Sequence, residues 1–163
     1  MTTTRKSGAI ALLSAALLFD PTFFTVGNAA AQQGVQTVEI TFTKWFTRNP
    51  DGTFGPHMEG IVGGVLGNGT FAGEILANPR STRFNITRLE AIYHVQAGGH
   101  AFSALIQGGS SGATGYGKLQ GHIIAGTAGV GFPVRVEFQA GPCPQAPNGT
   151  CFRGTMRVDL APN

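Results

Sequence analysis

The feature that most constrains the fold is an alternation of apolar and polar residues with a period of two. In residues 36–46, single polar residues separate Val38, Ile40 and Phe42. Such alternation is typical of a half-buried β-strand, and no window after residue 31 shows a sustained helical period of 3.6 residues. Gly, Asn, Asp and Pro interrupt the alternation as turn residues do. The chain is therefore predicted to be all-β, with its first strand at residues 36–46.

A glycine-rich hairpin follows this first strand. An Asn68-Gly69 turn would be a two-residue hairpin loop. It would place Val62 opposite Ile75 and Gly63 opposite Glu74, and both faces of the hairpin would be largely apolar. A strand pair that is apolar on both faces indicates burial in a larger structure or a contact between subunits.

A second hairpin is predicted around Gly98-Gly99. Its register would place Tyr93 opposite Ala104 and Val95 opposite Phe102 on an apolar face. Residues 115–125 follow as a further strand.

The last hairpin combines an apolar face with cross-strand charges. If Cys143 lies opposite Cys151, then Val136 faces Val158. The outer face then pairs Glu137 with Arg157 and Arg135 with Asp159, as cross-strand neighbours of opposite charge prefer. Altogether residues 32–163 form about eight strands in one domain, which predicts an eight-stranded antiparallel, calycin-like β-barrel with room for packed side chains or one small ligand.

Residues 1–31 have the pattern of a cleavable signal peptide. Arg5 and Lys6 precede an uncharged apolar run at residues 8–19, and three alanines end at Ala31. An uncleaved anchor is the alternative, but twelve apolar residues are too few to span a bilayer, which needs about 20. We expect cleavage near Gln32, export to the periplasm or the cell exterior, and no membrane span in the mature chain.

The two cysteines, Cys143 and Cys151, lie eight positions apart in one segment. In an oxidising compartment this pair is expected to form a disulfide, and a metal pair or free thiols are the alternatives.

The four histidines have no H-x-H or H-x-x-x-H spacing, so no metal site is predicted. No cofactor motif is found, because the glycines at residues 63–69 lie in a hairpin without a following helix.

The formal net charge of +3 does not indicate a nucleic-acid partner. The charge falls by one when residues 1–31 are removed, and the remaining basic residues alternate with acidic ones instead of forming a stripe.

Two carboxylates, Glu59 and Glu74, share a hairpin face that is otherwise apolar. If this face lines a cavity, Glu59 and Glu74 are candidate ligand-binding residues and Glu74 a candidate general acid or base, since apolar surroundings raise a carboxyl pKa. Otherwise Glu74 faces solvent or pairs with an arginine.

The segment GIVGGVLGNGTFAGEIL at residues 60–76, together with CFRGTMRV at residues 151–158, resembles small secreted bacterial proteins related to allene oxide cyclase-like and dirigent-like barrels. The resemblance implies an eight-stranded antiparallel barrel, often trimeric. In the plant members the cavity holds a reactive hydrophobic intermediate and steers its cyclisation or coupling. No plant catalytic motif matches residue by residue, so no catalytic residue is carried over.

Two functions are consistent with this pattern. The first is a secreted barrel that binds a small apolar molecule and guides its cyclisation or coupling; as an enzyme it would be a cofactor-free isomerase or cyclase, although binding without catalysis is the simpler reading. The alternative is a non-catalytic structural or interaction module that assembles through an apolar outer sheet face, as a homo-oligomer.

Overall fold

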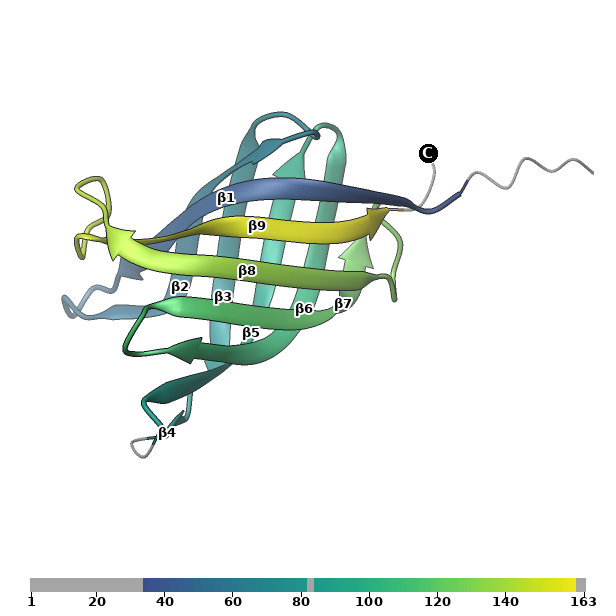
Figure 1. Ribbon diagram of the computed structural model, residues 1–163. Helices are drawn as coiled ribbons and strands as arrows, with labels where there is room; N and C mark the ends of the chain where they lie inside the picture. The colour runs from purple at the N-terminus through teal and green to yellow at the C-terminus, as the bar shows by residue number, and fades with distance from the viewer. Residues whose placement is uncertain (1–33, 82–83, 161–163) are drawn as a thin grey trace, which may run out of the picture. The chain divides into compact units, whose positions relative to one another are not determined.

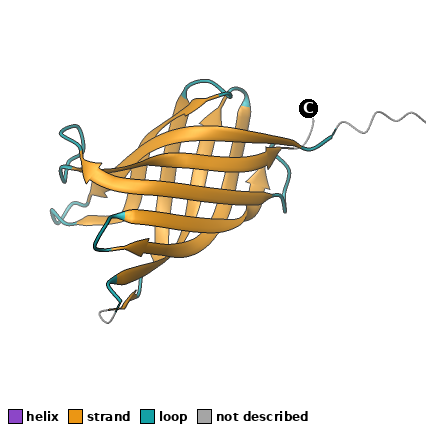
Figure 2. Ribbon diagram, in the orientation of Figure 1, coloured by secondary structure: helices purple, strands orange, loops and turns teal. Residues whose placement is uncertain are grey.

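The structure is a computed structural model that describes residues 34–81 and 84–160, and strands joined by turns and loops make up this part of the chain (Figure 2). The proposed signal peptide, residues 1–31, lies outside the described residues. The strands are β1 (Gln36–Arg48), β2 (Phe54–Gly64), β3 (Gly69–Ala77), β4 (Arg80–Ser81), β5 (Ile86–Ala97), β6 (His100–Ser111), β7 (Tyr116–Gly126), β8 (Pro133–Pro142) and β9 (Thr150–Leu160).

Eight of these strands form a closed antiparallel barrel, which confirms the predicted architecture. Neighbouring strands pair in the order β3-β2-β1-β9-β8-β7-β6-β5, and a β3–β5 ladder closes the ring. Strands β1, β9 and β8 cross in front of β2 and β3 (Figure 1). The short β4 pairs with the first residues of β5. No helix among the described residues is long and apolar enough to cross a membrane.

The inward-facing side chains of the eight strands form one continuous core. On β1 the predicted alternation is confirmed, because Val38, Ile40 and Phe42 are all buried. The β5–β6 register is confirmed as well, with Val95 opposite Phe102. The same alternation therefore accounts for both the strands and the core.

The register of the β2–β3 hairpin differs from the prediction. Val62 lies opposite Gly69 instead of Ile75, and residues 65–68 form the connection. The chain turns earlier than expected because Gly64 has a φ of 105°, which favours glycine, and its carbonyl oxygen accepts a 2.9 Å hydrogen bond from Gly67 N. The shift is an even number of residues, so each side chain stays on its predicted face.

The β8–β9 register also differs, by two residues: Val136 lies opposite Met156 instead of Val158. Cys143 lies beyond the end of β8, and its N–H donates a 2.9 Å hydrogen bond to Gly149 O. Cys143 and Cys151 form a disulfide with 5.3 Å between their Cα atoms, which confirms the predicted bond without requiring the two residues to be opposite each other in the ladder.

The charged side chains of this hairpin pair with other strands than expected. Glu137 forms a 2.9 Å ion pair with Lys118 of β7, and Arg157 forms a 2.8 Å ion pair with Glu39 of β1. Asp159 accepts a 2.6 Å hydrogen bond from Thr37. In a closed barrel every strand has two neighbouring strands, so a charged side chain can pair with residues on either of them. The sequence prediction included only the partner strand within the hairpin.

The two ends of the barrel differ. One end carries the β2–β3, β5–β6 and β7–β8 connections, and it is filled by apolar side chains that include the buried Ala97, Ala128 and Leu160. The opposite end carries the β1–β2 and β6–β7 connections and the disulfide loop between β8 and β9, on the left in Figure 1. We call this second end the disulfide end.

Candidate functional site

A lysine lies inside the barrel near the disulfide end. Lys44 follows Phe42 on the inward face of β1 and is only 2% exposed. Among the described residues, Lys44 is the only buried residue with a charged side chain. Lysine is almost never fully buried without a partner, because removing its ammonium group from water is costly. Its position in the core therefore calls for a functional explanation.

Four aromatic rings surround the Nζ atom of Lys44. The ring centre of Tyr93 on β5 lies 3.8 Å from Nζ, and those of Phe42, Phe71 and Phe138 lie 5.2–5.3 Å away. We call these four rings the aromatic cage. The rings of Phe71 and Tyr93 also pack edge to face, 4.8 Å apart. The cage comes from four different strands, so only the closed barrel assembles it.

Tyr93 supplies the polar partner of the lysine. Nζ of Lys44 donates a hydrogen bond to the phenol oxygen of Tyr93. Burial lowers the pKa of Lys44 well below its ordinary value of 10.5, and burial raises the pKa of Tyr93 above 10.0. Both shifts favour the uncharged forms of the amine and the phenol.

A cavity of about 230 Å³ lies over this pair. Lys44, Tyr93, Met58 and Phe138 are its buried lining residues, and the lining also contains half-buried apolar side chains and polar residues at the ends of strands. The half-buried or exposed lining residues are Phe46, Ile75, Asn78, Thr87, Leu89, Ser110 and Phe152. This gradient of exposure shows that the cavity opens at the disulfide end.

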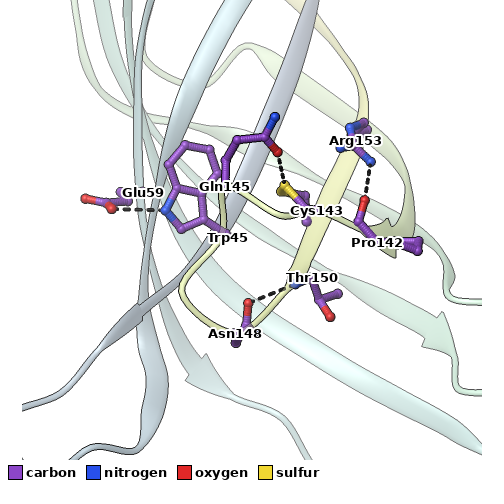
Figure 3. Close-up of a disulfide and its surroundings, with 9 residues drawn as sticks. Trp45, Glu59, Pro142, Cys143, Gln145, Asn148, Thr150 and Arg153 are labelled. Carbon is purple, nitrogen blue, oxygen red and sulfur yellow. Dashed lines mark hydrogen bonds between the residues drawn. A yellow bond between two sulfur atoms is a disulfide. The ribbon is translucent and has the colours of Figure 1, made fainter.

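The disulfide loop is anchored beside the cavity. The buried Cys143, Ala146 and Cys151 pack against Trp45, which neighbours Lys44 on β1 and points to the opposite face. The indole of Trp45 donates a 3.0 Å hydrogen bond to a carboxylate oxygen of Glu59 on β2 (Figure 3). Trp45 therefore links the loop to the two strands that position Lys44.

The chain was compared with protein families and curated proteins. No family model and no curated protein matches it. A desolvated amine, a phenol and an apolar enclosure can bind a small molecule and exchange protons with it.

The two candidate carboxylates do not belong to this cavity. Glu74 is exposed on the outer face of β3, opposite His57 and not Gly63, and Glu59 is exposed on the outer face of β2. The cavity is lined instead by residues of the opposite face, including Met58 and Ile75. Glu59 and Glu74 therefore lie outside this cavity, and the exposure of Glu74 matches the alternative reading in which it faces solvent.

The sequence interpretation placed Tyr93 on an apolar strand face but missed Lys44. The position of Lys44 in the alternation could have revealed it. Lys44 lies between Phe42 and Phe46 and continues the period of two set by Val38 and Ile40, so it falls on the apolar face of the strand. A charge in phase with an apolar face is an exception to the pattern and marks a candidate site.

The histidines are separate from the cavity. His94 on the outer face of β5 forms a 2.7 Å hydrogen bond with Ser103, and His100 lies beside the β5–β6 turn at the other end. Within residues 34–81 and 84–160, no three His, Cys, Asp or Glu side chains gather as metal ligands would.

Proposed function

We propose that this protein binds one small, mainly apolar molecule in the cavity at the disulfide end. The observation that carries the proposal is the open cavity over the buried Lys44–Tyr93 pair. A cavity and a buried amine both reduce the stability of a core, so a chain that only needed to fold would fill this space with an apolar side chain. Such exceptions are expected at functional sites.

The size and lining of the cavity define the class of ligand. Its volume of about 230 Å³ is below the roughly 300–1,000 Å³ of pockets for drug-sized ligands. The apolar walls match a compact hydrocarbon or aromatic body, and Lys44 and Tyr93 match one polar group at its inner end. The ligand is therefore a small molecule with an apolar body and a single polar group.

Export and a steering role belong to the same proposal. The pattern of residues 1–31 supports export, and the Cys143–Cys151 disulfide is a bond that forms in oxidising compartments. The closed eight-stranded barrel is compatible with a calycin-like or allene oxide cyclase-like relationship. Held between aromatic walls and away from water, a flexible ligand would be oriented for cyclisation or coupling without a cofactor.

Binding is tested with the variant Ile75→Phe, in which a larger side chain narrows the cavity. Ile75 points into the cavity, whereas its neighbour Leu76 lies on the outer face of β3 and is 49% exposed. The purified protein is titrated with a panel of small aromatic and aliphatic alcohols that includes cinnamyl alcohol, using calorimetry and native mass spectrometry.

We expect one saturable site per chain. Ile75→Phe should weaken binding by about tenfold or more, which corresponds to about 1.4 kcal/mol, and the matched control Leu76→Phe should leave binding unchanged. If none of the alcohols binds, or if both variants weaken binding equally, the proposal is wrong.

Exposed apolar residues support a second candidate, association of copies through the outer face of β2 and the connection that follows it. Ile61 is 59% exposed and Val65 is 73% exposed. In the observed register polar residues interrupt the apolar surface of this face more than predicted, because Ile61 lies opposite Thr70 and Glu74 lies opposite His57. Sedimentation of a strict monomer at high protein concentration would contradict this candidate without affecting the cavity.

A further inference from the structure

We propose that Lys44 captures small apolar aldehydes or ketones covalently, as a Schiff base formed in the cavity. This inference rests on the proposed binding function and names the chemical class of the ligand. It is carried by the position of Nζ in the lining of an open apolar cavity, hydrogen-bonded to Tyr93 and surrounded by the aromatic cage.

The first step of the argument is the state of the amine. A lysine attacks a carbonyl carbon only when its nitrogen has a free electron pair, and desolvation in an apolar pocket produces this form. Tyr93 is the other titratable residue of the lining, so no carboxylate among the described lining residues holds Lys44 in its ammonium form. The lowered pKa of Lys44 is consistent with this environment.

The reaction needs no cofactor and no change of oxidation state. Nζ adds to the carbonyl carbon, a C–N bond forms, and the carbonyl oxygen takes up the proton that the nitrogen releases. The resulting carbinolamine then loses its hydroxyl group with the second nitrogen proton as water, and a C=N bond replaces the C–O bond. The phenol of Tyr93 adjoins Nζ, so it can donate a proton to the departing oxygen and recover one from the nitrogen.

The aromatic cage has a specific part in this reaction. Positive charge develops on the nitrogen as water leaves, and an iminium ion forms when the imine takes up a proton from solvent. Ring faces at 3.8–5.3 Å from Nζ attract such a cation. The rings therefore stabilise the charged intermediate more than the neutral resting amine, which is the condition for acceleration.

The rest of the described chain offers a control within the same molecule. Lys118 on β7 has a 68% exposed side chain and an ion pair with Glu137, and the hydrogen bond to Glu137 raises the pKa of Lys118. Lys118 is thus held as an ammonium ion in water, without an apolar pocket. The proposal predicts that carbonyl compounds react with Lys44 and not with Lys118.

The experiment uses three ligands of nearly equal size: cinnamaldehyde, cinnamyl alcohol and cinnamate. The purified full chain is incubated with cinnamaldehyde at neutral pH, treated with cyanoborohydride to reduce any imine, and digested for peptide mass spectrometry. We expect the adduct on Lys44 at a rate at least about tenfold above that on Lys118, and equal rates in the urea-unfolded chain. This comparison needs no variant, and Lys44→Met should remove the fast adduct.

The outcomes separate this inference from the proposed function. Saturable binding of cinnamyl alcohol without preferential labelling of Lys44 would overturn the Schiff base and leave the binding function intact. Tight binding of cinnamate with no adduct from cinnamaldehyde would show that Lys44 acts as a cationic partner for a carboxylate, which also overturns the inference. If neither cinnamyl alcohol nor cinnamaldehyde binds or reacts in the cavity, both proposals fail.

Discussion

The ring of Phe138 lies over Gly117, its direct partner on the neighbouring strand, in the space that a side chain at Gly117 would occupy. Phe138 is also part of the aromatic cage and packs edge to face against Phe152 at 5.6 Å between ring centres. The missing side chain on β7 therefore determines where a ring on β8 lies, and through this ring one wall of the cavity.

Gly117→Ala should accordingly affect both stability and binding. A β-carbon at Gly117 overlaps the ring of Phe138, so the ring must shift toward the cavity. We expect a loss of about 1–3 kcal/mol in the free energy of unfolding, as for other overpacked cores, and weaker binding of cinnamyl alcohol. Urea unfolding and calorimetry measure the two effects.

Gly141→Ala is the matched control, because a β-carbon there meets only the end of the Arg153 side chain, at 3.9 Å. Its stability should be unchanged or slightly higher. Equal behaviour of the two alanine variants would contradict the role assigned to Gly117.

Lys44→Met should change how stability depends on pH. Burial lowers the pKa of Lys44, so between this lowered pKa and 10.5 the unfolded chain binds more protons than the folded one. The free energy of unfolding of the wild type therefore rises with pH in this window, by at most about 1.4 kcal/mol per pH unit, relative to the Met variant.

The two proteins are compared below pH 10. Above pH 10 the ionisation of Tyr93 makes the free energy of unfolding fall with pH, which is opposite to the effect of Lys44. The raised pKa of Tyr93 makes the folded chain the stronger proton binder once unfolded tyrosine ionises near 10.0. Urea unfolding of both proteins from neutral pH toward pH 10 tests the prediction. Parallel curves would mean that Lys44 keeps its ordinary pKa in the folded barrel.

Tyr93→Phe should slow the capture of cinnamaldehyde. The variant keeps the ring of the aromatic cage but loses the hydroxyl group that adjoins Nζ. We expect the rate of cyanoborohydride-trapped adduct formation on Lys44 to fall about 100-fold, a typical contribution of a general acid. Tyr116→Phe, at the 42% exposed second tyrosine of the chain, should leave the rate unchanged. A similar fall in both variants would indicate a non-specific effect.

Removing the disulfide should destabilise the barrel without abolishing the fold. In the chain-entropy model a loop closed between residues with a sequence separation of eight contributes about 2–3 kcal/mol. We expect a loss of this size in Cys143→Ala/Cys151→Ala, because alanine avoids burying new polar groups. Reduction of the wild type should have the same effect in urea unfolding. An unchanged midpoint in either sample would show that packing around Trp45 holds the loop by itself.

Glu74→Gln should leave ligand binding unchanged. Its carboxylate is exposed on the outer face of β3, away from the cavity. Calorimetric titration with cinnamyl alcohol should give the wild-type affinity within about twofold, since surface changes away from a site have small effects. A larger loss would restore this carboxylate as a candidate site residue.

Which residues face inward was largely predictable from the sequence. The alternation on β1 identified the buried Val38, Ile40 and Phe42, and the Gly98-Gly99 turn gave the correct β5–β6 pairing. In a two-residue turn the local sequence determines both the turn type and the register. The disulfide also followed from local spacing.

The registers of the other two hairpins were not predictable in this way. Moving one strand by an even number of residues keeps every side chain on its face, so the period-two pattern allows several registers equally well. The choice depended on the left-handed Gly64 before the β2–β3 turn and on the position of Cys143 beyond β8. The expected pairing of Glu137 with Arg157 failed because β7 and β1 supply partners from the other sides.

The amino-acid sequence by itself predicted that the described part of the chain is all-β, which faces of its strands are apolar, and that Cys143 and Cys151 form a disulfide. Only the tertiary structure decided what surrounds Lys44. Its partners Tyr93, Phe71 and Phe138 come from strands that meet only when β3 pairs with β5 and β1 with β9. Alternation is a local property of one strand, whereas a cavity and the desolvation of an amine depend on all the strands that enclose them.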